Sequence, residues 1–288
     1  MKFIKAQVLG NDFLVLNQKE TERIEDLQSF ACLVCDRHFG IGADGLIITS
    51  LIGKKKDEAS FRVFNHDGTE AEVSGNGLRC AAAYMYYFEL TDSPKITFHT
   101  NAGIRVSELL EKDKTTYLLR IDMGVPIFSS QEIPFDDGSE YEKLVDYDLT
   151  IGQKKYKITC LSIGNPHCAV FVSNFPSRIE WHQMGREIES HPFFPNRTNV
   201  EFVKVINRDE IEALFWERGV GETLASGSGA CASAVASILK GLTNRRVKVK
   251  TSSGELIVEW EGDKIFQIGP VEVICEITLA KEISPKLE

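Results

Sequence analysis

Short segments in which apolar and polar residues alternate run through most of the chain, a pattern typical of β-strands rather than long helices. In the first half, strands are predicted at Phe3–Val8, Phe13–Leu16, Leu46–Ser50, Phe61–Asn65, Lys95–Thr100 and Thr116–Asp122. In the second half, they are predicted at Tyr156–Ser162, Ala169–Val172, Val200–Ile206, Glu212–Glu217, Val247–Lys250, Leu256–Trp260 and Glu272–Thr278. The chain is therefore expected to be rich in short strands.

Apolar residues at helical spacing occur between these strands. One helical stretch is predicted from about Ile24 to His38. Two Ala-rich helices are also predicted, one that follows Gly77 and one at Ala230–Lys240. Many short strands beside two prominent helices predict an α+β fold. The segment Phe128–Asp148, rich in Ser, Asp and Glu, is predicted to link the two halves.

An internal repeat connects the two Ala-rich helices. Glu70–Gly77 and Glu222–Gly229 share the pattern Glu-x-x-x-Ser-Gly-x-Gly, and the two copies lie about half the chain length apart. This spacing indicates duplication of one lobe. Each pattern places a serine and two glycines where a strand passes into a helix.

The repeated loop has two interpretations. Ser74 and Ser226 could simply cap the helices, with the glycines closing tight turns. Alternatively, the unpaired N–H groups at both helix N-termini could hold the carboxylate of one ligand. One side chain from each lobe would then remove a proton from the carbon next to that carboxylate and return one to its opposite face.

Composition narrows the classes of function. The chain has 288 residues, with 33 Lys and Arg against 42 Asp and Glu, so its net charge of −9 disfavours a nucleic-acid groove. No apolar stretch approaches the roughly 20 residues of a membrane span, and Met1–Val8 lacks the apolar core of a secretion signal. Seven cysteines, an odd number, predict free thiols and a cytoplasmic location. Cys32 and Cys35 are interpreted as buried helix residues rather than a metal or redox pair.

Several glycine-rich and amide-rich motifs, taken together, resemble the diaminopimelate epimerases. They are Leu9-Gly-Asn-Asp-Phe13, Gly40-Ile-Gly-Ala-Asp-Gly45, Phe64-Asn-x-Asp-Gly68, Gly75-Asn-Gly-x-Arg-Cys80, Met123-Gly-x-Pro126, Gly164-Asn-Pro-His167, Asn199-Val-Glu-Phe202 and Glu217-Arg-Gly-x-Gly-Glu-Thr223. The resemblance implies two pseudo-symmetric lobes, each a barrel-like mixed sheet around a central helix, with the active site in the cleft. One lobe would contain residues 1–122 and a returning C-terminal strand at 276–288, and the other residues 123–275.

The resemblance also implies an activity: interconversion of LL- and meso-diaminopimelate in lysine and peptidoglycan biosynthesis. The enzyme would be a homodimer acting on a small amino acid, without pyridoxal phosphate, another cofactor or a metal. The implied donors to the carboxylate at the reacting centre are the backbones of Gly75, Asn76, Gly227 and Ser228. The residues implied to recognise the two ends of the substrate are Asn11, Asn65, Asn165, Asn199 and Arg218.

His167 and Glu217 are implied to lie beside the two acid/base positions and tune them. Judged without the resemblance, His167 could equally be a hydrogen-bonded histidine in a turn. Glu217 and Arg218 could likewise form a local ion pair.

The two acid/base positions differ from the family pattern. The family has cysteine before each Gly-x-Gly, whereas this chain has Ser74 and Ser226. A thiol with a reference pKa of about 8.5 can exchange protons near neutral pH, but a serine hydroxyl is a far weaker acid. Cys80 and Cys231 lie within the predicted helices and are not assigned the catalytic role.

Three explanations of the serines stay open. Both could replace the thiols of a working epimerase by introduced substitution. The chain could be a homologue that binds diaminopimelate-like amino acids without turnover. The fold could also support a racemase or isomerase that uses another base, such as His167, Glu217 or a further carboxylate.

Overall fold

The computed structural model describes residues 1–279 and divides the chain into two compact units. Unit 1 contains Met1–Ile121 together with the chain from Gly269 onward, and unit 2 is the continuous segment Asp122–Ile268. The sequence placed the return to the first unit at Glu276, whereas the contacts place it at Gly269. Residues 280–288 of that expected strand lie outside the described residues.

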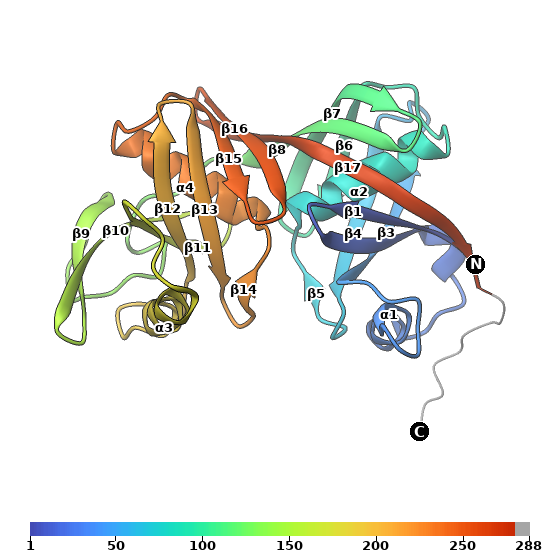
Figure 1. The fold of residues 1–288 in the computed structure, drawn as a ribbon. Coiled ribbons are helices and arrows are strands. Elements are labelled where there is room, and N and C mark those ends of the chain that lie inside the picture. Colours follow the sequence, from blue (N-terminus) through green and yellow to red (C-terminus); the bar gives the residue numbers. More distant parts are fainter. Residues whose placement is uncertain (280–288) are drawn as a thin grey trace. The chain divides into compact units, whose positions relative to one another are not determined.

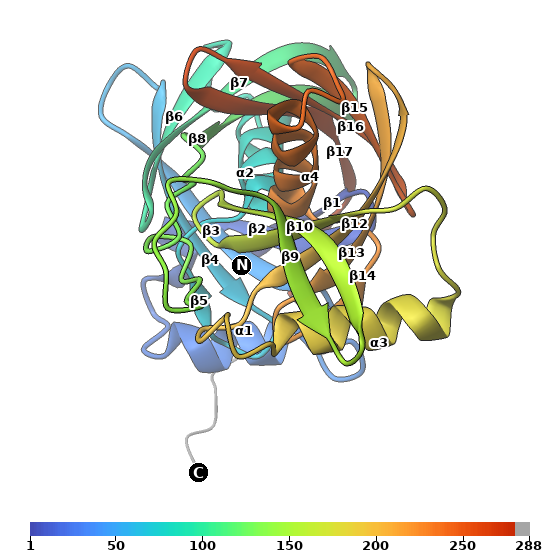
Figure 2. The same ribbon diagram turned by 90° about the vertical axis from the view of Figure 1, so that its left-hand side faces the viewer.

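In unit 1 a ring of paired strands surrounds one helix (Figures 1 and 2). The strands are β1 (Lys2–Val8), β2 (Asn11–Asn17), β3 (Gly45–Ile52), β4 (Glu58–Asn65), β5 (Glu70–Ala71), β6 (Lys95–Thr100), β7 (Gly103–Asp113), β8 (Thr116–Gly124) and the end of β17 (Lys264–Thr278). The helices are η1 (Gln18–Thr21), α1 (Leu27–Cys35) and α2 (Gly75–Tyr87), with α2 inside the ring. Because β17 pairs with both β1 and β8, the ring is closed.

Two parallel pairs interrupt the otherwise antiparallel ring of unit 1. Strand β2 runs parallel to β3, and β4 runs parallel to β6. A parallel pair needs a crossover connection, and α1 and α2 lie in the two crossovers. The chain therefore enters α2 directly from the end of β4 and the short strand β5, where the first copy of the repeated loop lies.

Unit 2 repeats this plan. Its strands are β9 (Leu144–Ile151), β10 (Lys154–Ser162), β11 (Pro166–Phe171), β12 (Asn199–Asn207), β13 (Glu210–Glu217), β14 (Gly221–Thr223), β15 (Arg246–Thr251), β16 (Gly254–Glu261) and the start of β17. Helix α3 (Arg178–Glu189) connects the parallel pair β11–β12, and α4 (Gly227–Leu239) connects the parallel pair β13–β15. The same order of pairings and crossovers confirms the predicted internal repeat.

Small side chains let each central helix lie within its sheet. Ala81, Ala82 and Ala83 of α2 are fully buried, as are Ala232 and Ala234 of α4. The polar residues of α4 do not need partners from the sheet, because the buried Ser233 and Ser237 hydroxyls donate to the carbonyls four residues earlier, at 2.8 and 2.7 Å. Each Ala-rich segment is thus a core helix whose N-terminus is fixed by the surrounding strands.

The predicted linker at Phe128–Asp148 is wrong. Ile133, Phe135 and Leu144 are buried in the core of unit 2, and β9 begins at Leu144. The Phe135 ring packs edge-on against Tyr147 and Phe194, with centroids 5.1 and 5.3 Å apart. The Ser, Asp and Glu residues that suggested a linker are separated by these apolar anchors, which are too widely spaced to form a strand or helix pattern.

Other predicted elements need correction at their ends. The helix predicted from Ile24 to His38 extends only from Leu27 to Cys35, because Asp26 caps its first turn through the backbone N–H groups of Gln28 and Ser29. Cys35 is buried as predicted, but Cys32 is exposed. The sequence interpretation also missed α3, β7 and β9, whose exposed positions carry many charged residues.

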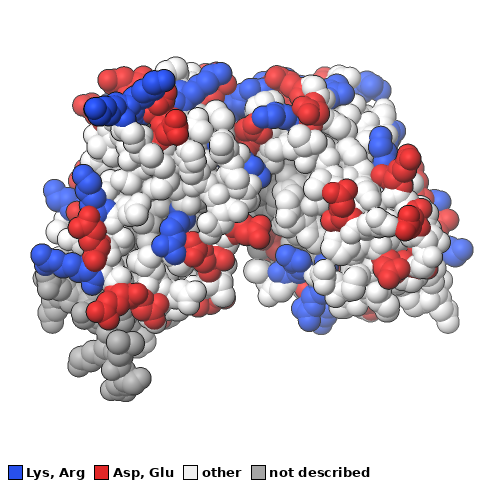
Figure 3. Space-filling view, turned by 180° about the vertical axis from the view of Figure 1, so that it is seen from behind, with Lys and Arg blue, Asp and Glu red and all other residues white. Residues whose placement is uncertain are grey.

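Charges of both signs are interspersed over the face shown in Figure 3, without a continuous basic stripe. Among the described residues, no helix combines the length and the apolar character needed to cross a membrane.

Candidate active site

Ser74 caps the N-terminus of α2. Its backbone is extended, and its Oγ accepts the N–H of Gly77 at 3.0 Å. The first bond of the helix ladder runs from Leu78 N–H to the Ser74 carbonyl, so the N–H groups of Gly75 and Asn76 have no intrahelical partner. Unit 1 therefore presents two backbone donors at a helix N-terminus, as the sequence predicts.

Ser226 caps α4 in the same way. Its Oγ accepts the N–H of Gly229 at 3.1 Å, and Ala230 N–H makes the first ladder bond to the Ser226 carbonyl at 3.0 Å. A Cβ on Gly229 would lie 2.8 Å from the Phe215 ring, so the sheet approaches the helix too closely for any larger residue. The N–H groups of Gly227 and Ser228 correspond to those of Gly75 and Asn76 in unit 1.

Two amide side chains meet at the N-terminus of α2. Asn76 Nδ2 donates to Asn11 Oδ1 at 3.0 Å, and Asn11 Nδ2 donates to Asp44 Oδ2 at 2.8 Å. Asn76 Oδ1 in turn accepts from the fully buried guanidinium of Arg79 at 3.2 Å. Asn11 and Asn76, predicted separately, thus belong to one connected polar network.

Asn65 lies beside this network, at the end of β4. Its register partner on β3 is Gly45, and its Nδ2 donates to the Thr69 hydroxyl at 2.9 Å. The side chain of Asn65 is exposed and does not hydrogen-bond to Asn11 or Asn76.

In unit 2 a buried imidazole lies between an amide and a carboxylate. His167 Nδ1 is 2.6 Å from Glu201 Oε1, and His167 Nε2 is 2.8 Å from Asn165 Oδ1. The side chains of His167 and Glu201 are 0% and 1% exposed. Burial raises the pKa of the Glu201 carboxyl, and the nearby charge of Glu217 adds to this effect, whereas His167 opposes it.

The register of the sheet explains why His167 and Glu201 are in contact. Strands β11 and β12 are parallel, with His167 opposite Asn199. Asn199 and Glu201 are two residues apart on β12, so both point to the face that His167 shares. The sequence interpretation missed Glu201, although it lies in the quoted Asn199-Val-Glu-Phe202 motif and alternates with Asn199.

Glu217 is the last residue of β13, and Arg218 begins the turn to β14. The backbone N–H of Arg218 donates to Asn199 Oδ1 at 2.9 Å, and Asn199 Nδ2 donates to the Pro166 carbonyl at 2.8 Å. Glu217 Oε1 accepts the Thr223 hydroxyl at 2.9 Å. Asn199 therefore joins the turn to β11, and the Arg218 guanidinium donates to the carbonyl of Asn196 rather than to Glu217.

A second carboxylate missed by the sequence interpretation holds the same turn. Glu189, 6% exposed at the end of α3, accepts the N–H of Gly219 and the indole N–H of Trp216, both at 2.8 Å. Glu189 is far from Glu217 in sequence and matches no site motif, so no local signal could have identified it.

The cysteines that follow the two serines, Cys80 and Cys231, do not provide an exposed thiol at either helix N-terminus. Cys80 and Cys231 are buried inside α2 and α4, and burial raises the pKa of the Cys80 thiol to about 12. Within residues 1–279, no cluster of three or more His, Cys, Asp or Glu residues is arranged to hold a metal ion.

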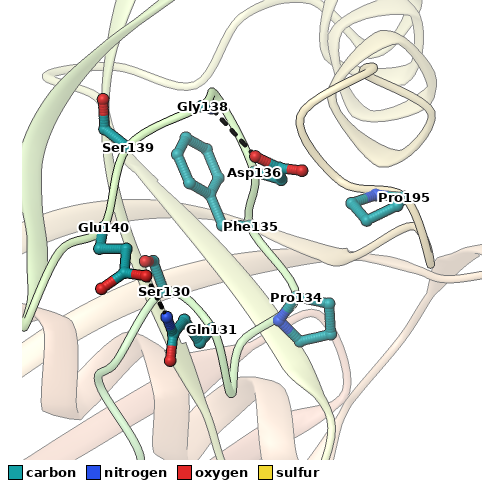
Figure 4. A pocket seen from close by; sticks show the side chains of 9 residues that line it. All are labelled: Ser130, Gln131, Pro134, Phe135, Asp136, Gly138, Ser139, Glu140 and Pro195. Carbon is teal, nitrogen blue, oxygen red and sulfur yellow. Dashed lines mark hydrogen bonds between the residues drawn. The ribbon is translucent and has the colours of Figure 1, made fainter.

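A surface hollow of about 490 Å³ in unit 2 contains none of the predicted site residues (Figure 4). The Phe135 ring, Pro134 and Pro195 line it. Some of its polar side chains form hydrogen bonds with other lining residues. Asp136 accepts the Gly138 N–H at 3.0 Å, and Gln131 donates to Glu140 at 2.5 Å.

Comparison with solved structures identifies the fold. The chain matches a predicted epimerase from Pseudomonas aeruginosa with a TM-score of 0.66 and 16% identity, covering 98% of this chain and 99% of that one. It also matches a probable proline racemase from Agrobacterium radiobacter with a TM-score of 0.67 and 14% identity, covering 99% and 94%. The fold is thus the one found in this class of epimerases and racemases.

Sequence comparison identifies the family. The diaminopimelate epimerase profile matches residues 3–129 and 159–274. The diaminopimelate epimerase of Pelotomaculum thermopropionicum is 43% identical over 276 residues, covering 95% of this chain and 97% of that protein. The diaminopimelate epimerase of Acetivibrio thermocellus is 41% identical over 281 residues, covering 96% and 97%. The chain belongs to the diaminopimelate epimerase family.

Proposed function

We propose that this amino-acid epimerase binds diaminopimelate, and that Ser74 and Ser226 occupy its two acid/base positions. The observation that carries the proposal is the repeated helix N-terminus. In each unit, a capping serine precedes two backbone N–H groups that have no intrahelical partner. Such donors favour a carboxylate, and proton transfer at the adjacent carbon needs one group on each of its faces.

The chemistry of serine implies that this chain is much less active than a thiol-bearing version. Each hydroxyl oxygen already accepts a backbone N–H. Among the described residues, neither hydroxyl is hydrogen-bonded to a carboxylate or an imidazole of its own unit. Without a neighbouring base, a serine hydroxyl neither removes nor returns a proton readily at neutral pH.

The remaining site residues support recognition of an amino acid with two polar ends. The proposed substrate-binding set consists of Asn11, Asn65, Gly75, Asn76, Asn165, Asn199, Arg218, Gly227 and Ser228. The exposed Arg218 supplies a positive charge for a second carboxylate. The backbone groups at the helix N-termini bind the carboxylate at the reacting centre.

His167 and Glu217 are proposed to tune the acid/base positions. Both nitrogens of His167 are within hydrogen-bond distance of protein oxygens, and the ring is fully buried. This geometry disfavours His167 as a base that contacts substrate directly, which weakens the alternative of a same-fold isomerase using that residue. A binding protein without turnover remains the second candidate, because the two capped hydroxyls are compatible with it.

We also propose a cytoplasmic homodimer. All seven cysteines are free, which suits a reducing compartment. Light scattering of the purified protein at several concentrations tests the dimer: a single species with the mass of one chain would contradict it.

The decisive experiment is proton exchange at the substrate α-carbon in D₂O. The chain and its Ser74→Cys/Ser226→Cys variant are each incubated with LL-diaminopimelate, and mass spectrometry follows deuterium uptake and formation of the meso form. The double variant should exchange faster by at least about 10³-fold, since groups that act as a unit are restored together.

Three results would contradict these assignments. Rapid exchange by the chain with both serines would refute the expectation of impaired activity. Tight binding without exchange by the double variant would favour the non-catalytic alternative. A third substitution, Arg218→Ala, tests the substrate: unchanged binding of diaminopimelate would refute recognition of its second charged end.

A further inference from the structure

The network of unit 1 has an unambiguous hydrogen-bond direction. A carboxylate can only accept hydrogen bonds and a guanidinium can only donate them, whereas an amide can do either according to its rotation. Asp44 lies at one end of the network and Arg79 at the other, with the amides of Asn11 and Asn76 between them. The two charged ends therefore determine which way both amides point.

We propose that Asp44 is a positioning residue, which orients the amide of Asn11 and through it the amide of Asn76, while Arg79 fixes the opposite end. This inference rests on the proposed function, because it explains how unit 1 prepares its side of the substrate site. It adds Asp44 and Arg79 to the residues that determine binding, although neither needs to contact the ligand.

The surroundings of Asp44 suit this role. Its Oδ2 accepts from Asn11 and also from the backbone N–H of Asp12 at 3.1 Å, and its Oδ1 accepts from Arg37 at 2.8 Å. Its own backbone N–H donates to Asp12 Oδ1 at 3.1 Å. Both oxygens are thus held in place, so the carboxylate presents a fixed acceptor to Asn11.

The arrangement leaves defined donors for a ligand. Each of the two amide nitrogens gives one of its two hydrogens to the network. Among residues 1–279, the second N–H of Asn11 and of Asn76 donates to no other group, and the Asn76 side chain belongs to the same helix N-terminus as the backbone donors of Gly75 and Asn76. A carboxylate-bearing ligand matches such a set of donors.

Replacing the Asp44 carboxylate by an amide would remove one of the two groups that fix the direction of the hydrogen bonds in this network. In an Asp44→Asn variant, the new side chain can donate to Asn11 as well as accept from it, so this end of the network no longer excludes the other rotation of Asn11. Only Arg79, acting through Asn76, still opposes that rotation. Asn76 would then be constrained only by Arg79. Ligand binding would have to select one arrangement from several, which lowers the apparent affinity.

Asp12→Asn is a matched control. Asp12 lies in the same ionic cluster, pairs with Arg37 at 2.7 Å and with Lys5 at 2.9 Å, and loses the same charge on substitution. Its side chain does not hydrogen-bond to Asn11 or Asn76. A general effect of charge or stability would appear in both variants, whereas loss of amide orientation would appear only in Asp44→Asn.

Two measurements test the proposal. Calorimetric titration with meso-diaminopimelate should show about tenfold weaker binding for Asp44→Asn, the loss expected for one hydrogen bond to a charged group, and less than about twofold for Asp12→Asn. Independently of any ligand, the side-chain amide NMR signals of Asn11 and Asn76 should shift or broaden in Asp44→Asn. The Asn76 signal should stay in place in Asp12→Asn.

The outcomes separate this proposal from the proposed function. Equal changes in both variants, in affinity and in the amide signals, would overturn the role of Asp44. If the parent chain does not bind diaminopimelate but the Asn76 signal responds only to Asp44→Asn, the proposed function fails and the positioning role stands. If Asp44→Asn does not fold, Asp44→Glu retains the charge but displaces the carboxylate, and it should cause the same loss of affinity and the same Asn76 shift.

Discussion

The two units hold their serine-capped helix N-termini with different polar side chains. Each presents a serine-capped helix inside a curved sheet, but the supporting groups differ. In unit 1 the helix N-terminus is joined through Asn76, Asn11 and Asp44 to ion pairs at the surface. In unit 2 the support is a buried imidazole–carboxylate pair, His167 and Glu201. Duplication has kept the backbone donors, whereas the side chains around them have diverged.

This difference suggests a division of labour. A network of amides sets geometry, because amides do not titrate, whereas a buried carboxyl with a raised pKa beside an imidazole can influence proton transfer. We therefore expect substitutions in unit 1 to change mainly affinity, and those around His167 to change mainly turnover.

The largest effect concerns the two serines taken separately. Ser74→Cys alone and Ser226→Cys alone should each stay at least about 100-fold below the double variant in epimerisation, because inversion needs a working group on both faces of the carbon. Racemisation assays by chiral chromatography provide the measurement. A single variant with near-full activity would show that one unit alone performs the chemistry.

The next effect concerns Glu201. In the double-cysteine background, Glu201→Gln should lower kcat by about tenfold with little change in KM, because it replaces the carboxyl group that lies 2.6 Å from His167 Nδ1 and one hydrogen bond contributes about 0.5–1.5 kcal/mol. Asp44→Asn in the same background should instead raise KM. Similar kcat and KM changes in both variants would erase the proposed contrast between the units.

Packing at the two helix N-termini gives a stability prediction. Gly229→Ala should destabilise the protein by about 1–3 kcal/mol, because its Cβ would lie 2.8 Å from the Phe215 ring. Gly77→Ala should cost less than about 1 kcal/mol, because its nearest contacts are 3.1–3.2 Å away and alanine favours the helix. Urea denaturation of both variants gives the comparison, and equal losses would contradict it.

The smallest effect is the pH-dependent contribution of the Arg37–Asp12 ion pair in unit 1 to the free energy of unfolding. Burial alone raises the pKa of Asp12, but the hydrogen bonds and charges of Arg37 and Lys5 outweigh it and hold the pKa below its usual value. The associated stability is present above the unfolded pKa of about 3.9 and is lost as pH falls through the lower folded value. Arg37→Gln should therefore cost up to about 1 kcal/mol at pH 7 and less near pH 2.

Urea denaturation at the two pH values measures this contribution. A cost for Arg37→Gln that is equal at both values would show that the Arg37–Asp12 pair does not underlie the acid dependence.

Local patterns predicted much of the fold because strand alternation and capping act over short distances. The strand predicted at Phe3–Val8 is β1, and Lys95–Thr100 is β6. The repeated loop correctly predicted that Ser74 and Ser226 precede two buried helices. The sequence patterns did not predict burial that depends on distant contacts. Ile133 and Phe135 are buried in the core of unit 2, but no pattern of apolar residues around them in the sequence predicts this burial.

The candidate site divides in the same way. Residues within motifs, such as Asn11, His167 and Arg218, could be selected from the sequence. Asp44 and Glu201 also lie within the quoted motifs, but their partners are fixed by the register between strands or by loop closure. Glu189 reaches Gly219 from the end of a helix that the sequence interpretation did not predict. The contact between Glu189 and Gly219 joins residues far apart in the chain, so no short segment of the sequence predicts it.

The path of β17 has a consequence for the order in which the chain folds. Gln7 of β1 pairs with Glu272 of β17, so the sheet of unit 1 is completed by residues near the end of the chain. During synthesis, the continuous segment Asp122–Ile268 leaves the ribosome before that partner strand exists. The first unit to be translated is therefore the last to close, and until then the edges of β1 and β8 that will pair with β17 remain open to misplaced strands.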